Sequence, residues 1–237
     1  MIGFRLRVLF SIFVASSCVV QSIGFKWEQH LNPNGKAESI ECSSVSGSDL
    51  FQGSILDKVE SEFIDYPRFL ARRKVLLGLF TAEKKFHGEA DPTTRICDSL
   101  LGINLLTFGK TKTTRFTLKE KRVSGSCTVE TRGVITRLPV VGGLLACRPK
   151  TNDASQSSVG TLTFQLTQSR SKSPEFKDNL HIETRILDYE PAIAGKPPVN
   201  FLRKTVYLHT QRYFHAYVMW RFHNHCYNIL VPPYQSN

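Results

Sequence analysis

Histidine is the residue type best suited to metal or acid–base chemistry in this sequence, and four of its seven histidines lie near the C-terminus. They are His209, His215, His223 and His225. Two metal ligands on one helical face need a spacing of three or four residues, whereas these histidines are separated by six, eight and two. His223 and His225 share a face only in an extended chain. The spacing therefore favours histidines that pack as aromatic residues with one polar edge, and no metal site is expected.

Six cysteines offer thiol chemistry or disulfides, but no two of them have the two-residue spacing of a zinc knuckle or a redox motif. Cys18 lies in an N-terminal segment that has the pattern of a removable leader. Five cysteines then remain, so at least one thiol stays free or pairs with another molecule, and at most two bridges form. The pairing is left open among Cys42, Cys97, Cys127, Cys147 and Cys226.

Sequence motifs of enzymes are missing. There is no Gly-x-Ser-x-Gly elbow, and Gly142-Gly143 lacks the further glycines and the lysine of a phosphate-binding loop. Cys147 and a distant histidine form a conceivable thiol pair, but any chain with this many cysteines and histidines offers such pairs. A binding protein is therefore favoured over an enzyme, no catalytic residue is nominated, and no cofactor is expected.

A basic surface is the clearest indication of a partner, because the chain has a formal net charge of +11. In one strand-like segment, Phe116 and Leu118 alternate with basic residues. If the apolar residues face inward, the outer face carries Arg115, Lys119 and Lys121, which we expect to meet anionic headgroups. Lysines that protect an edge strand from aggregation are the alternative. Nucleic acid is not expected as a partner of an exported protein.

The N-terminus has the pattern of a secretory signal. Arg5 and Arg7 precede an apolar run from Val8 to Ala15, which small residues follow. The run is too short for a hydrocarbon core of about 30 Å. We therefore predict a cleaved signal at residues 1–24 and a secreted or lumenal protein. An aromatic Phe25 after the cut and the lack of Asn-x-Ser/Thr sequons keep a plastid or a bacterial envelope as alternatives.

Helical patterns precede strand patterns along the chain. A polar segment at residues 25–50 is followed by three expected helices: one opened by a Ser54–Asp57 capping box, one from Pro67 to Phe80, and one from Asp91 to Leu105. Four or five antiparallel strands are expected between Lys110 and Ile186. Such an order argues for a single α+β domain at residues 51–228, with a tail at residues 229–237.

The last expected element, residues 201–226, is rich in aromatic residues. Alternation from Phe214 to Phe222 fits a strand, but a run of about 25 residues is long for a strand and ordinary for a helix. We therefore expect an antiparallel sheet packed against a long C-terminal helix, with a helical segment N-terminal to the sheet. One face of that helix carries Leu202, Val206, Tyr213, Tyr217 and Trp220.

One segment and the order of elements resemble a known superfamily. Residues 63–70, Phe-Ile-Asp-Tyr-Pro-Arg-Phe-Leu, are similar to the segment before the sheet in some members of the START-related (SRPBCC-like) helix-grip superfamily. The resemblance in element order covers about residues 38–228. It implies a curved sheet around the last helix, and a cavity for apolar ligands faced by Tyr213, Tyr217 and Trp220. Two features depart from the family pattern: the expected helical region at residues 67–106 is too long, and too few strands follow it.

These observations predict a non-enzymatic protein that binds an apolar or amphipathic, lipid-like ligand, with an anionic membrane surface as a further partner. A small enzyme using His or Cys chemistry in the same cavity, and a structural interaction module, are the two alternatives. The identity of the ligand and the oligomeric state are left open.

Overall fold

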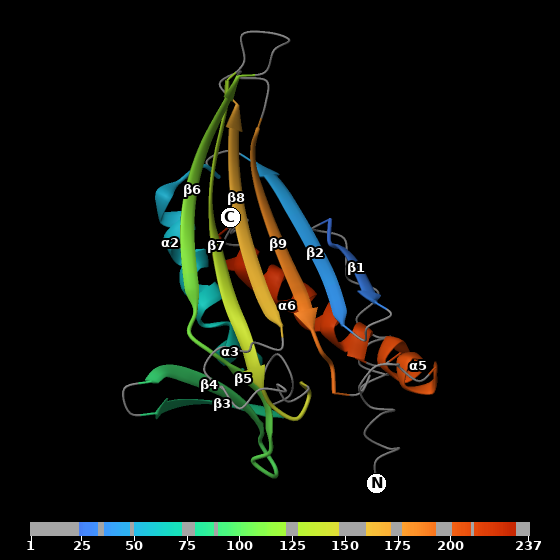
Figure 1. Ribbon diagram of the computed structural model, residues 1–237. Coiled ribbons are helices and arrows are strands. Elements are labelled where there is room, and N and C mark those ends of the chain that lie inside the picture. Colours follow the sequence, from blue (N-terminus) through green and yellow to red (C-terminus); the bar gives the residue numbers. More distant parts are fainter. Residues whose placement is uncertain are drawn as a thin grey trace, which may run out of the picture.

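A computed structural model gives the fold of the chain (Figure 1). The predicted leader up to residue 23, Cys127 and Cys147 lie outside the described residues. The structure describes residues 24–32, 36–47, 50–72, 79–87, 90–121, 128–146, 160–171, 177–192, 201–209 and 211–230.

Strands dominate these residues, and short helices interrupt or follow them. The elements in chain order are β1 (Lys26–Leu31), β2 (Ala37–Gly47), α2 (Gly53–Ile64), α3 (Tyr66–Leu70), β3 (Phe80–His87), β4 (Ala90–Asp98), β5 (Asn104–Phe108), β6 (Lys112–Lys121), β7 (Thr128–Gly142), β8 (Thr161–Ser171), β9 (Asp178–Tyr189), α5 (Phe201–His209) and α6 (Gln211–Leu230).

The described strands form one antiparallel sheet in the order β1-β2-β9-β8-β7-β5-β4-β3, and β6 pairs with β7 beside this path. Strand β7 changes neighbour along its length. Residues 128–137 of β7 pair with β6, whereas Val140 and Gly142 pair with β5. Pro139 lies between the two stretches, where its missing N–H interrupts neither ladder. An apolar segment that contains a proline thus continues a strand.

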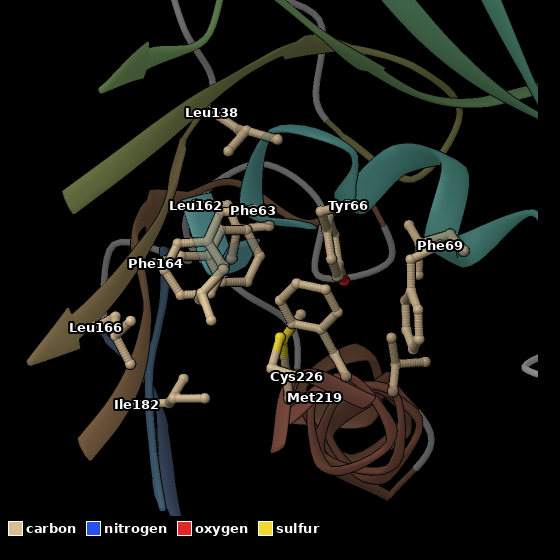
Figure 2. Packing of buried hydrophobic residues seen from close by; sticks show 14 of the residues in the cluster. Phe63, Tyr66, Phe69, Leu138, Leu162, Phe164, Leu166, Ile182, Met219 and Cys226 are labelled. Atoms are coloured by element: carbon tan, nitrogen blue, oxygen red, sulfur yellow. The ribbon is translucent and has the colours of Figure 1, made fainter. Parts of the chain in front are cut away.

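One face of the sheet is apolar and is covered by helices (Figure 1). Leu162, Phe164 and Leu166 alternate with more exposed residues along β8, so their side chains all point to this inner face. Phe63 of α2 stacks on Phe164 with 5.1 Å between ring centroids. Figure 2 shows these rings together with Tyr66 of α3, whose centroid lies 4.8 Å from that of Phe164. The core is therefore built on aromatic contacts between α2, α3 and the sheet.

The predicted fold class, a sheet packed against one long C-terminal helix after an N-terminal helical segment, is wrong. Strand residues outnumber helix residues, and the molecule is mainly a large antiparallel sheet. The C-terminal element is divided into the separate helices α5 and α6. Residues 91–105 belong to strands β4 and β5 and the turn between them.

The helix expected at residues 91–105 rested on apolar residues at helical spacing: Ile96, Leu100, Leu101 and Leu105. Two of them, Leu100 and Leu101, lie in a turn and are 67% and 71% exposed. The Asp98 carboxylate accepts hydrogen bonds from both of their backbone N–H groups, and so closes the turn between the strands. Of the preceding predicted helix, Pro67–Phe80, the structure shows α3 ending at Leu70 and β3 beginning at Phe80, while residues 73–78 lie outside the described residues.

The helix near residue 54 is confirmed as α2, but its capping box is not used. Its N-cap residue is Gln52, and no side chain caps the helix. Asp57 forms an ion pair with Arg115 of β6 instead. A tertiary contact has replaced the local contact that the sequence suggested.

Among the described helices, none combines the length and the apolar character needed to cross a bilayer.

Candidate functional site

Polar side chains line the part of the inner sheet face that lies toward α6. On β2, Ser39, Glu41 and Ser43 occupy alternate positions and are all buried. Because side chains alternate along a strand, these three point to the same face. On the neighbouring β9, the equally buried Thr184 pairs in register with Glu41. A strip of buried hydrogen-bonding groups thus lies on the inner face, next to its apolar residues.

Glu41 is the most unusual residue of this strip, because its side chain is 0% exposed and carries a carboxylate. His215 of α6 places its Nε2 3.0 Å from Glu41 Oε1, and the Ser39 hydroxyl lies 3.3 Å from the same nitrogen. Burying a carboxylate is costly unless it is paired and hydrogen-bonded. The contact with His215 supplies the pairing.

Hydrogen bonding at Glu41 is incomplete. Within the described part of the chain, neither of its carboxylate oxygens accepts a hydrogen bond of good geometry. The same holds for Oε1 of Gln29, which lies opposite Ser39 in the β1–β2 ladder. It also holds for Oε1 of Gln211, one helical turn before His215. We call Gln29, Ser39, Glu41, Gln211 and His215 the Glu41 cluster.

The amide groups of the Glu41 cluster are turned in a consistent direction. Gln29 donates from Nε2 to the Tyr207 hydroxyl at 2.5 Å, and Gln211 donates from Nε2 to the Tyr189 hydroxyl at 3.5 Å. Both glutamines therefore leave their carbonyl oxygens as acceptors, like the carboxylate of Glu41. The cluster is chemically suited to a group that donates several hydrogen bonds.

His223 forms a second buried polar contact further along α6. Its Nδ1 lies 2.7 Å from the Ser43 hydroxyl, and its Nε2 lies 2.8 Å from the Thr184 hydroxyl. Burial lowers the pKa of His223 to about 3, and the charge of His181 contributes in the same direction. The ring is therefore neutral near pH 7 and holds α6 against β2 and β9.

The hydroxyl of Tyr227 completes this second contact. It donates to the Ser43 carbonyl oxygen at 2.9 Å, while the Ser43 hydroxyl donates to the Tyr227 oxygen at 3.4 Å. Ser43 then accepts from His223 Nδ1, and His223 Nε2 accepts from Thr184. Burial is also the main reason that the pKa of Tyr227 is raised, which keeps its proton in place. The polar groups of Ser43, Thr184, His223 and Tyr227 therefore find their hydrogen-bond partners among themselves and the backbone, unlike those of the Glu41 cluster.

Neither histidine has the arrangement of a serine-hydrolase triad. Such a triad needs the nucleophile and the carboxylate on opposite ring nitrogens. At His215 both Ser39 and Glu41 meet Nε2, and at His223 both partners are hydroxyl groups. The buried thiol of Cys226 is also unsuited to nucleophilic attack, because burial raises its pKa well above the ordinary value.

The ligand-binding residues predicted from the helical wheel lie mostly toward the surface. Leu202 and Val206 of α5 are 68% and 43% exposed, and Tyr213 at the start of α6 is 38% exposed. Tyr213 packs edge-to-face against Trp27 of β1. Tyr217 and Trp220 are partly buried, and their ring centroids are 6.0 Å apart.

The buried side of α6 is a different set of residues. Met219 and Cys226 enter the core near Phe63 and Tyr66 (Figure 2). Phe222 packs against Phe69 with 4.9 Å between ring centroids. The break between α5 and α6 means that one continuous wheel does not describe both helices.

The basic residues of β6 also lie differently from the expectation. Arg115 faces α2, where its guanidinium pairs with Asp57 at 2.8 Å and with Glu60. Phe116 points to the opposite face and lies over Gly133 of β7. Lys119 is exposed, while the side chain of Lys121 lies outside the described residues. Apolar and basic residues do alternate along β6, but Arg115 faces the helix-covered side of the sheet and Phe116 the opposite side, the reverse of the expectation.

Glu41 and Gln29 were missed as site residues because each stands in a run of mostly polar residues. Glu38 and Glu41 look alike in the sequence, yet Glu38 is exposed and Glu41 is buried. The period-two pattern of Ala37, Ser39, Glu41 and Ser43 was too polar to identify a buried face.

The sequence matches no known family model, and no curated protein is significantly similar to it.

Proposed function

We propose that this protein binds an amphipathic, lipid-like ligand whose polar head donates hydrogen bonds to the Glu41 cluster. The single observation that carries the proposal is the fully buried carboxylate of Glu41, which contacts His215 but accepts no hydrogen bond of good geometry from the described residues. An ammonium, a hydroxyl or an amide N–H of a ligand matches these acceptors, and a charge-assisted bond is the strongest of the three. Binding, rather than turnover, is the primary activity.

The aromatic and aliphatic surroundings of the cluster support an apolar body for this ligand. Burial raises the pKa of the Tyr66 hydroxyl, and the nearby negative charge of Glu41 adds to this effect. Trp27 is the register partner of Glu41 on β1 and packs against Tyr213. Apolar walls with a few convergent polar groups are typical of small-molecule sites.

The order of elements supports the START-related resemblance as part of this proposal. Among the described elements, two helices stand between β2 and β3, seven strands follow, and two helices come last. The early strand β2 pairs with the last strand β9. The resemblance adds the expectation that the ligand enters between the sheet and the C-terminal helices.

We further propose that helix α5 meets an anionic membrane surface, where such a ligand is exchanged. Phe201 and Leu202 are 83% and 68% exposed, and the exposed Arg203 and Lys204 follow them directly. Apolar side chains beside basic ones favour binding to anionic headgroups. Export through the predicted leader remains part of the proposal, and N-terminal sequencing of the mature protein tests it.

The test is recovery of a co-purifying ligand from the full chain and from two glutamate variants. Native mass spectrometry followed by solvent extraction should find an amphipathic molecule bound to the wild type. E41Q should lose most of it, because the ion-pairing acceptor is gone, while E38Q on the opposite face of β2 should retain it. Equal ligand content in all three proteins, or no ligand in any after addition of mixed lipid vesicles, would overturn the proposal.

A small enzyme acting in the same place is a second candidate, which the 3.0 Å approach of His215 Nε2 to Glu41 Oε1 favours. A histidine beside a carboxylate is a common acid–base pair. Incubation of the recovered ligand with wild type and with H215Q distinguishes the two functions. A product formed only by the wild type supports an enzyme, and an unchanged ligand rejects it.

A further inference from the structure

The outer face of the sheet, opposite the Glu41 cluster, brings together three side chains that are good metal ligands. They are Cys42 of β2 and His181 and Glu183 of β9. Their ligand atoms, the Cys42 Sγ, a ring nitrogen of His181 and a carboxylate oxygen of Glu183, all lie within 4.8 Å of one another. All three side chains are partly buried, so the group lies within reach of solvent ions.

The sheet register creates this group. Cys42 and Glu183 are directly opposite in the antiparallel β2–β9 ladder, and Ser44 is opposite His181. Side chains two residues apart on a strand share a face, so His181 and Glu183 lie on the same side as Cys42. Three ligands from two rigid strands give a site whose backbone geometry needs no rearrangement.

Glu183 is oriented so that one oxygen faces the other two ligands. Its Oε1 accepts from Arg185 Nε, which fixes the carboxylate. Its Oε2 lies 3.9 Å from Cys42 Sγ and 3.9 Å from His181 Nε2. Ligand atoms around a tetrahedral Zn²⁺ are separated by about 3.3–3.8 Å, given bonds of about 2.0–2.3 Å. Small side-chain rotations bring the three atoms to that separation.

We propose that Cys42, His181 and Glu183 bind a divalent transition-metal ion, with zinc the best match. A thiolate, an imidazole and a carboxylate together suit borderline-soft Zn²⁺ better than the hard ions Mg²⁺ or Ca²⁺. Three protein ligands leave the fourth tetrahedral position to water or to an exogenous ligand.

Glu183 places a negative charge beside both Cys42 and His181, whose Nε2 lies 3.9 Å from its Oε2. A cation in the centre of the group neutralises that charge. Arg185 contacts the far oxygen of Glu183, so it acts as a positioning partner.

Cobalt(II) binding by the full chain is the test, because a cysteine ligand gives a thiolate-to-cobalt charge-transfer band. The reduced protein is freed of metal with a chelator and titrated with Co²⁺, and then with Zn²⁺ in competition. We expect one Co²⁺ per chain, a charge-transfer band with tetrahedral d–d absorption, and displacement by Zn²⁺. C42S should lose the charge-transfer band, and H181A and E183Q should weaken binding by about tenfold or more.

His30 provides the matched control. It lies on β1 opposite Glu38, so H30Q removes a histidine from another cross-strand His–Glu pair that has no cysteine beside it. H30Q should bind Co²⁺ like the wild type, and so should E41Q, which makes this test independent of the proposed ligand. Absence of the band in the wild type, or equal Co²⁺ binding by wild type and H181A, would overturn the metal site. If C42S fails to fold, H181A decides, since its side chain is 33% exposed in the wild type.

Discussion

His223 and Ser43, separated by 180 residues in the chain, are joined by a hydrogen bond of 2.7 Å in the protein interior. The other ring nitrogen is held at 2.8 Å by Thr184. Through these contacts one side chain of α6 connects two adjacent strands, β2 and β9. The neutral ring therefore serves as a structural link between helix and sheet.

Replacing His223 with leucine should destabilise the protein. The change leaves buried hydroxyl groups without partners, so the free energy of unfolding should fall by about 1–3 kcal/mol. Urea unfolding followed by circular dichroism measures it. H209L, at an exposed position of α5, is the control and should change stability by less than about 0.5 kcal/mol. Equal stability of the two variants would contradict the structural role of His223.

Stability should fall on mild acidification because of His223. Its pKa is about 3 in the folded protein, and about 6.5 in an unfolded chain. Between these values the unfolded state binds a proton that the folded state does not, so stability falls by up to about 1.4 kcal/mol per pH unit as the pH decreases. Unfolding measured between pH 7 and 4.5 should show a smaller slope in H223Q, and an identical slope would reject the prediction.

Asp178 should add a second loss of stability at lower pH. Its hydrogen bond and ion pair with Arg170 hold the pKa of its carboxyl below the ordinary value. The resulting stabilisation is present above the unfolded pKa of about 4 and is lost as the pH falls through the folded value. D178N should unfold at lower urea concentration than wild type at pH 6, with the difference shrinking toward pH 2.5. A constant difference over this range would be evidence against the ion pair.

Phe63 should be among the costliest core residues to truncate. Its ring stacks on Phe164 and is tilted against Phe222 at 6.1 Å, and its exposure is 0%. F63A should lower the free energy of unfolding by about 3–5 kcal/mol. F201A removes the same ring from a site that is 83% exposed, so it should have little effect on stability. Similar effects of the two changes would contradict the described core.

Gly133 should not tolerate a methyl group. A Cβ atom at this position of β7 would collide with the Leu166 carbonyl oxygen of β8 and with the Phe116 ring of β6. G133A should therefore destabilise by about 1–3 kcal/mol in thermal unfolding. Gly53, at the start of α2, has open space around it, and G53A should be neutral or mildly stabilising. A G133A protein as stable as the wild type would contradict the close approach of β8 and of the Phe116 ring to Gly133.

Binding to anionic vesicles should depend on α5 and not on Arg115. Arg203 and Lys204 lie beside the exposed Phe201, whereas Arg115 is engaged by Asp57 and Glu60. R203Q/K204Q should weaken sedimentation with phosphatidylserine vesicles at low salt, by about fivefold for each charge removed. R115Q should leave binding nearly unchanged. A larger loss of vesicle binding in R115Q than in R203Q/K204Q would indicate that the membrane-binding surface lies on β6 instead.

Local sequence patterns were sufficient to predict an element where one of its faces is apolar and the other is polar. Alternation of apolar and polar residues identified the strands that became β6, β8 and β9, and the Ser54–Asp57 motif pointed to the helix α2, although the capping box itself is not formed. The same reasoning failed at Leu100 and Leu101, because two exposed turn residues fell by chance at helical positions. Apolar residues at helical spacing indicate a helix only when those residues are buried together on one face.

Only the tertiary structure decided which faces are inside and which distant residues meet. Alternation in β6 separates Arg115 from Phe116, but the position of α2 decides that Arg115 lies on the helix-covered face. Packing of α6 on β2 makes Glu41 a buried carboxylate while Glu38 stays exposed. The β2–β9 register places Cys42 opposite Glu183. Contacts of this kind depend on strand order and helix placement, which local periodicity does not encode.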